Sequence, residues 1–143
     1  MLDKISRGFA LFVNWFNGVL AVLCGIIMMF ADQIFPGGGD SFMPISIFDS
    51  FPFHDVFFTS LFWPGLALAL VNGLPNVIAL VFRFRGNRMA SYRWGIVAGI
   101  MLLVWTGVEM VYIPNPVSVF YMVLGLLQLI ASWWALRTWK LAA

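Results

Sequence analysis

The sequence predicts an all-α protein, a four-helix transmembrane bundle whose helices run up-down-up-down. The composition and the clustering of apolar residues carry this prediction: 62% of the 143 residues are hydrophobic, only 10% are charged, and the apolar residues gather in long runs. A soluble domain averages about half apolar and about a quarter charged residues, and a domain of this size has too small an interior to bury so much apolar surface. The lipid bilayer therefore has to solvate most of these side chains.

Four runs reach the length of about 20 apolar residues that spans a bilayer. We predict one transmembrane domain over residues 1–143, with helices at about 8–31, 56–82, 94–113 and 117–139 and one long outer loop at 32–55. The first run is longer than the apolar part of a secretion signal, roughly 7–15 residues, and no small-residue cleavage site follows it. We therefore expect the first run to be a membrane helix.

The positive charges predict the orientation of the helices. They are Lys4 and Arg7 before the first run, Arg83, Arg85, Arg88 and Arg93 between the second and third runs, and Arg137 and Lys140 after the fourth. Four alternating helices bring these three segments to one face of the membrane, and the positive-inside bias assigns that face to the cytoplasm. Both termini are therefore predicted to be cytoplasmic. The net charge of +2 gives no reason to expect a nucleic-acid partner.

Glu109 is the only acidic residue inside any of the apolar runs. An ionisable residue within a membrane is a functional hypothesis by default, and in the predicted topology every Lys and Arg lies at the opposite face. We expect the carboxyl group to be protonated, to be held by neutral donors such as Thr106, Tyr112 and Tyr121, or to pair with a bound cation. The alternative is that Glu109, about one turn from Pro114, reaches water at the level of the lipid headgroups.

Amide side chains lie in the other apolar runs. Asn72 and Asn76 flank small residues at four-residue spacing, and Pro75 removes a backbone hydrogen bond and frees a carbonyl near Asn72 that needs a partner. Gln128 lies near the middle of the last run. Interrupted helices with polar residues line cavities in transporters, whereas a kink that only improves packing explains the same residues. Both interpretations stay open.

One face of the first run combines small residues with amides. Its residues, at steps of three and four, are Asn14, Asn17, Gly18, Ala21, Gly25 and Met28. Small residues allow neighbouring helices to approach, and amides can form hydrogen bonds across the contact. This pattern predicts a packing seam between helices, with a substrate site as the alternative.

Prolines and a phenylalanine-rich loop mark the connections. Asn115 and Pro116 predict an N-cap and a first-turn proline, so the last two helices form a tight hairpin. Pro64 either begins the spanning part of the second run or kinks a longer helix. The outer loop is long enough to have a role, and we expect it on the membrane surface or folded back as a lid. It contains His54, which lies near Asp49 and Asp55, but one histidine among carboxylates does not predict a metal site.

Several short motifs carry a resemblance to known proteins. They are Pro52-Phe53-His54-Asp55, Trp63-Pro64-Gly65, Val104-Trp105 followed by Glu109, and Tyr121 followed by Gly125-Leu126. With the basic connection between the second and third runs, they resemble a group of small uncharacterised bacterial four-helix membrane proteins and, more distantly in size and helix count, DoxX-like proteins. The resemblance implies a bundle in the bacterial inner membrane and transfers no catalytic residues.

The sequence contains no recognisable set of catalytic nucleophiles, metal ligands or paired haem ligands, so we predict no enzyme, no cofactor and no metal. The first expectation is an accessory, structural or interaction subunit. The alternative is binding or transport of a small molecule, a lipid or a cation through a protonatable Glu109. The candidate ligand-binding residues are Glu109, Asn72, Asn76, Gln128, Thr106, Tyr112, Tyr121 and His54. The predicted partners of the protein are the lipid bilayer and either a second copy of the chain or a larger membrane protein.

Overall fold

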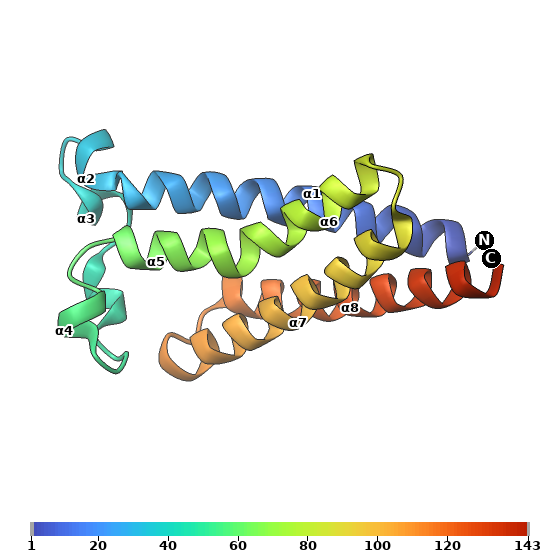
Figure 1. The fold of residues 1–143 in the computed structure, drawn as a ribbon. Helices are drawn as coiled ribbons and strands as arrows, with labels where there is room; N and C mark the ends of the chain where they lie inside the picture. The colour runs from blue at the N-terminus through green and yellow to red at the C-terminus, as the bar shows by residue number, and fades with distance from the viewer. Residues whose placement is uncertain (1, 143) are drawn as a thin grey trace.

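The computed structural model describes residues 2–142, which are mostly helical (Figure 1). The elements are α1 (Leu2–Met29), α2 (Ala31–Ile34), α3 (Gly39–Phe42), the 3-10 helix η1 (Ile45–Phe48), α4 (His54–Phe57), α5 (Phe62–Ala67), the π-helix η2 (Leu68–Gly73), α6 (Leu74–Phe84), α7 (Arg88–Tyr112) and α8 (Pro116–Ala142). Residues 1 and 143, which the predicted domain includes, lie outside this range.

Within the described residues there is no strand, and four helical segments are long and apolar enough to cross a membrane. They are Lys4–Met29, Phe62–Phe84, Arg88–Tyr112 and Pro116–Leu141. The second of these segments is made of α5, η2 and α6 in continuous succession. The predicted all-α class and the presence of four helices of membrane-spanning length are therefore confirmed.

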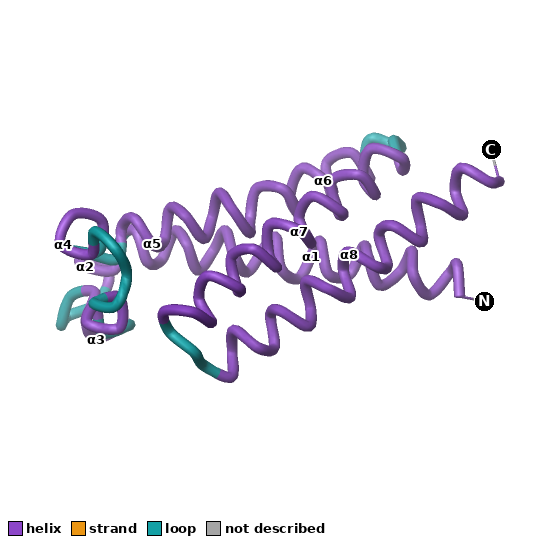
Figure 2. The backbone as a smooth tube through the Cα atoms, turned by 90° about the horizontal axis from the view of Figure 1, so that it is seen from below, coloured by secondary structure: helices purple, strands orange, loops and turns teal. Residues whose placement is uncertain are grey.

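The long helices lie side by side in an elongated bundle (Figures 1 and 2). α1 packs along α5, η2 and α6, α7 packs along α6 and α8, and α8 returns against α1. Figure 1 shows the two chain ends together at one end of the bundle, with the turn between α6 and α7 towards the same end. The short helices α2, α3 and α4 lie at the other end. The basic segments of the chain thus gather at the end that holds the termini, which we call the basic end.

Two helices begin where an asparagine caps them. The side chain of Asn87 accepts a hydrogen bond from the Ala90 amide (3.0 Å), and α7 starts at Arg88, before the predicted start at 94. At α8, the Asn115 side chain accepts from the Ser118 amide (2.9 Å), which confirms Asn115 as the predicted N-cap. A side-chain oxygen at this position satisfies an amide that has no partner within the helix. Most of the basic connection is therefore helical.

The second spanning segment differs from the predicted helix 56–82. Residues 58–61 are not helical, and α5 begins at Phe62, so Pro64 lies in the first turn, where a proline is tolerated. The segment then widens into the π-helix η2 just before Pro75. Because proline donates no hydrogen bond and crowds the preceding turn, the regular α-helical pattern changes there.

The predicted packing seam on α1 is confirmed, because all six of its residues are buried. The closest approach joins α1 to α5 at Gly25 and Gly65. A Cβ atom added at either glycine would lie 2.6 Å from the carbonyl oxygen of the other. The two backbones therefore touch at a point where a larger residue would separate the helices.

The connection between α1 and α5 was predicted as one loop, and it contains short helical turns instead. Asp32 Oδ1 accepts a hydrogen bond from the Gly39 amide (2.7 Å), and Asp40 Oδ1 accepts from the Ile45 amide (2.9 Å). Apolar residues of this connection pack on the end of the bundle, around a small core. The core is formed by Met28, Ala31 and Leu61, with Phe35, Met43, Ile45, Phe48 and Leu68 against it. The connection thus covers the ends of α1 and α5.

Candidate functional site

The interior of the bundle contains a buried group of polar side chains, which we call the amide cluster. Its members are Asn14, Asn72, Asn76, Gln128 and Ser132, together with Asn17, which lies three residues from Asn14 on the same face of α1, and each is at most 3% exposed. Gln128 is at its centre, because Gln128 Nε2 donates to Asn14 Oδ1 (2.8 Å) and to Asn76 Oδ1 (2.6 Å). The cluster therefore joins three of the spanning segments through one side chain.

Small residues bring these amides within hydrogen-bonding distance. A Cβ atom added at Gly18 would lie 2.9 Å from the Cβ of Asn76, so α1 and α6 are in contact beside the cluster. On α7, a Cβ atom added at Gly95 would lie 2.5 Å from Ser132 Oγ. Glycine at these positions leaves the space that the polar side chains occupy. The remaining spanning segment, α7, therefore borders the cluster with the backbone of Gly95 rather than with a polar side chain.

The backbone break in the second spanning segment is part of the same cluster. Asn72 belongs to η2, and its carbonyl oxygen accepts a hydrogen bond from Asn76 Nδ2 (2.7 Å). The Asn76 side chain thus binds a carbonyl of the π-helix, whereas the carbonyl that Pro75 deprives of its α-helical donor belongs to Val71, four residues earlier. Short π-helical turns inside α-helices occur frequently at functional sites. Asn72 lies within this π-helix and is buried.

Four polar atoms of the cluster have no hydrogen-bond partner among the described residues. They are Asn17 Nδ2, Asn72 Oδ1, Gln128 Oε1 and Ser132 Oγ. A buried polar group without a partner costs about 1–3 kcal/mol, and buried polar groups in native proteins are almost always satisfied by protein or by ordered water. These four atoms therefore call for additional hydrogen-bonding groups inside the cluster.

Glu109 lies outside the amide cluster, in a polar network of its own that we call the hairpin network. Trp105 Nε1 donates to Glu109 Oε1 (2.7 Å), and Ser118 Oγ donates to Glu109 Oε2 (2.7 Å). Among the described residues, no Lys or Arg lies within 4 Å of this carboxylate. Each carboxylate oxygen is thus bound by one neutral donor, one from α7 and one from α8.

The turn between α7 and α8 completes the hairpin network. Asn115 Nδ2 donates to Ser118 Oγ (2.8 Å) and to the Ile113 carbonyl (2.8 Å). Asn115 therefore caps α8 and holds the hydroxyl group that binds Glu109. The connected hydrogen bonds tie the last turn of α7 to the first turn of α8.

The prediction that neutral donors hold Glu109 is confirmed, but Thr106, Tyr112 and Tyr121, which were named as examples, are not those donors. Thr106 Oγ1 donates to the Leu102 carbonyl of its own helix (2.8 Å). The ring of Tyr112 contacts Phe51 with centroids 4.7 Å apart, and the ring of Tyr121 contacts Phe120 at 5.4 Å. In the described residues, none of these three side chains forms a hydrogen bond with Glu109. Tyr121 nevertheless lies within electrostatic range of the carboxylate.

His54 is separate from both polar centres. Its Nε2 lies 3.0 Å from Asp55 Oδ1, and its Nδ1 lies 3.3 Å from the Phe51 carbonyl oxygen. Within residues 2–142, no group of three or more His, Cys, Asp and Glu side chains is placed to hold a metal ion. Of the predicted ligand-binding residues, the structure therefore links Asn72, Asn76 and Gln128 by hydrogen bonds, and it shows no hydrogen bond among the remaining five in the described residues.

Sequence reasoning missed several members of both centres. Trp105 is four residues before Glu109, which places the two side chains on one helical face, and this spacing was available in the sequence. Ser118 follows the Asn115 cap by three residues, which also predicts proximity to the end of α7. Asn14 and Asn17 were predicted to belong to a packing seam, with a substrate site as the alternative, and were not linked to Asn72, Asn76 and Gln128. A buried amide on each of several neighbouring helices was the signal that linked them.

Comparison of the chain with protein-family models, with curated proteins and with solved structures finds no match. The resemblance to small bacterial four-helix membrane proteins therefore stays a prediction.

Proposed function

We propose that this chain is a multi-pass membrane protein of the bacterial inner membrane, with the basic end and both termini in the cytoplasm. The support is the distribution of charge: all eight Lys and Arg residues belong to segments that gather at one end of the bundle. Cationic segments are retained on the cytoplasmic side during insertion. The bilayer is thus the first partner of the protein.

The orientation is tested by labelling single cysteines with a membrane-impermeant maleimide in intact cells, in a Cys24→Ser background. Lys4→Cys should be protected until the membrane is opened, and Asp40→Cys in the connection between α1 and α5 should be labelled at once. Labelling of Lys4→Cys in intact cells would overturn the proposed orientation.

We propose that the protein binds a small hydrogen-bond-donating solute in the amide cluster. The observation that supports this is the presence of four buried polar atoms without a partner, beside a π-helix and at the meeting point of the spanning segments. Two of the free atoms are amide oxygens and a third is a hydroxyl oxygen, whereas the fourth is an amide nitrogen. Since a hydroxyl group can both accept and donate, three of the four atoms can accept and two can donate, and a solute rich in N–H or O–H groups complements the excess of acceptors.

The proposed site is neutral. None of its six members carries a charge, so it can select a solute by hydrogen bonds and by size but not by charge pairing. Amide and hydroxyl oxygens also form the kind of environment that accepts a small cation. Ammonium, which is small and has only donors, is the simplest probe of such a site.

The test measures the thermal unfolding of the purified protein in detergent, in ammonium chloride and in tetramethylammonium chloride of the same concentration. Tetramethylammonium has the same charge and no N–H group. We expect ammonium to raise the Tm of the wild-type protein relative to tetramethylammonium, because a ligand that binds only the folded state stabilises it. Ser132→Ala removes a hydroxyl group that forms no hydrogen bond in the described structure, and it should abolish the difference.

Thr106→Val is the matched control, because Thr106 is equally buried but donates only to its own helix. This variant should retain the full difference between the two salts. Equal Tm values of the wild-type protein in the two salts, or the same loss in Thr106→Val as in Ser132→Ala, would refute the proposed ligand chemistry.

A second candidate is the accessory or interaction subunit that the sequence first predicted, and one observation favours it. Phe53 is 74% exposed and has φ of 61°, the only positive φ of a non-glycine residue in the described chain. Such a conformation is costly for a bulky residue and is found where function requires it. Val56, Phe57, Phe62 and Trp63 are also exposed. These aromatic and aliphatic side chains would form the docking surface for a larger membrane protein.

This candidate is tested by purification from native membranes. If the surface docks a partner, one protein co-purifies in stoichiometric amount with the wild-type chain and is lost with Phe53→Gly, which removes the ring and suits the positive φ. Val111→Gly, at a side chain that is 75% exposed on α7, controls for the loss of an exposed apolar group. Retention of the partner by Phe53→Gly would rule out this docking surface.

A further inference from the structure

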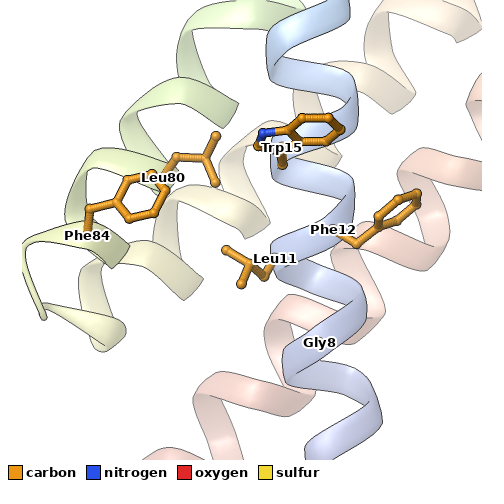
Figure 3. A pocket seen from close by; sticks show the side chains of 6 residues that line it. All are labelled: Gly8, Leu11, Phe12, Trp15, Leu80 and Phe84. Atoms are coloured by element: carbon orange, nitrogen blue, oxygen red, sulfur yellow. The ribbon is translucent and has the colours of Figure 1, made fainter.

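An apolar groove of about 390 Å³ lies between α1 and α6 near the basic end (Figure 3). It is lined by Gly8, Leu11, Phe12 and Trp15 of α1 and by Leu80 and Phe84 of α6. Figure 3 shows Leu11 and Trp15 on one side facing Leu80 and Phe84 on the other. From Gly8 to Trp15 the helix rises by about 10 Å. The groove thus offers an elongated apolar channel along the direction of the helices.

Gly8 leaves one end of the groove open, although no neighbouring helix requires a glycine there. A Cβ atom added at Gly8 would meet no other heavy atom within 4 Å. Gly18 and Gly25 of the same helix differ, because a Cβ atom there would lie less than 3 Å from α6 or α5. Glycine inside a helix is less favourable than alanine, and close packing explains it at these two positions only. No contact within the chain therefore requires a glycine at position 8, and the space beside it is open.

Positive charge flanks the same end of the groove. Lys4 precedes Gly8 by one helical turn on the same face of α1, and Arg85 directly follows Phe84. Both side chains are exposed, and neither pairs with a carboxylate among the described side chains. By contrast, Arg7 and Arg88 lie over the ring of Trp139. Lys4 and Arg85 therefore remain available to an anion at the mouth of the groove.

We propose that this groove is a binding site for an anionic phospholipid, with one acyl chain along the groove and the headgroup phosphate between Lys4 and Arg85. The apolar walls complement the acyl chain, and the two cations complement the phosphate and any further negative charge of the headgroup. Basic residues near the cytoplasmic surface of a membrane attract anionic lipids. The open space at Gly8 leaves room for the part of the acyl chain nearest the headgroup to lie against α1. The site does not depend on the ligand proposed for the amide cluster.

The experiment titrates the delipidated protein in detergent with phosphatidylglycerol or with phosphatidylcholine of the same acyl chains and measures binding of the first lipid by native mass spectrometry. The wild-type protein should bind phosphatidylglycerol at least about fivefold more tightly, the factor that one cation near a membrane surface supplies. Gly8→Leu places a side chain in the groove and should remove most of the tight binding. Arg85→Gln should reduce the preference for phosphatidylglycerol by about fivefold.

Two matched controls separate the groove from general effects. Gly107 is also a helical glycine with no heavy atom within 4 Å of an added Cβ, but it lies on α7, so Gly107→Leu should leave lipid binding unchanged. Arg93 is an exposed arginine that does not border the groove, so Arg93→Gln should keep the lipid preference. Phe84→Ala serves as a second groove variant, because Phe84 is 80% exposed and its truncation should leave the fold intact.

The proposal fails if the wild-type protein binds the two lipids equally tightly. It also fails if Gly8→Leu and Phe84→Ala both bind phosphatidylglycerol as the wild type does, or if Arg93→Gln lowers the preference as much as Arg85→Gln.

Discussion

Gln128 and Glu109 lie in the two helices of one hairpin, and each is a polar side chain within a helix that is long and apolar enough to cross a membrane. Gln128 bonds to residues of α1 and α6, far away in the sequence, and one of its own polar atoms remains without a partner. Glu109 bonds to Trp105 of its own helix and to Ser118 just beyond the turn, and both of its oxygens are occupied. The charged residue is thus the more completely satisfied of the two.

The hydrogen-bond partners of Glu109 are close to it in the sequence, whereas those of Gln128 belong to distant helices. A carboxyl group close to a helical turn can find hydrogen-bond donors within a few residues. An amide in the middle of a bundle depends on what the neighbouring helices present, and geometry seldom satisfies all members of such a group at once. The hydrogen-bonding capacity left in the amide cluster is therefore the observation that supports the proposed ligand site.

The largest effect is expected from Gln128→Leu. It removes two hydrogen bonds and leaves the side-chain oxygens of Asn14 and Asn76 without their donor, so we expect the free energy of unfolding to fall by about 2–3 kcal/mol. Reversible unfolding in mixed micelles measures this change.

Thr106→Val is again the control, because it removes a buried hydroxyl that bonds only to its own helix. It should cost less than about 1 kcal/mol. If Gln128→Leu were no more destabilising than Thr106→Val, the amide cluster would contribute little to holding the helices together.

A smaller effect is expected from Asn115→Ala in the hairpin network. The substitution removes the α8 cap and the amide that holds Ser118, so we expect a loss of about 1–2 kcal/mol. Asn87→Ala removes the α7 cap but no bond to a further side chain, and it should cost about 1 kcal/mol or less. Both are measured by the same unfolding assay. A loss with Asn87→Ala as large as with Asn115→Ala would mean that the hairpin network adds nothing to the cap itself.

The spanning helices were predictable because each is specified by its own composition. A long apolar run, a cap such as Asn115 and a small-residue face on α1 are local properties that survive into the bundle unchanged. The turns in the connection between α1 and α5 were not predictable in the same way. They depend on single hydrogen bonds, such as the one from the Gly39 amide to Asp32. A periodic pattern of residues does not predict such bonds.

The amide cluster and the hairpin network also differ in how much of each the sequence predicted. The sequence grouped Asn72, Asn76 and Gln128 with Glu109 as candidate ligand-binding residues, and the structure links the three amides by hydrogen bonds and places Glu109 in a separate network. The donors to Glu109 were misassigned because the expectation considered hydroxyl groups and overlooked the indole of Trp105 one turn away. That Gln128 retains a free oxygen could not be predicted, since it depends on how far apart the helices pack.

The smallest effect is expected from Glu109→Gln, and it tests the separation of the two centres most directly. The Gln oxygen can still accept from Trp105 Nε1, and its amide nitrogen would face Ser118 Oγ, which can act as an acceptor. We therefore expect a loss of less than about 1 kcal/mol in the free energy of unfolding. The difference in Tm between ammonium and tetramethylammonium should remain as large as in the wild-type protein, because Glu109 bonds to no member of the amide cluster. Glu109→Leu, which removes both acceptors, should cost more than Glu109→Gln and yet leave that difference intact. If either substitution abolished the ammonium effect, the carboxylate would belong to the binding site after all, and proton exchange at Glu109 would replace the neutral amide cluster as the basis of ligand binding.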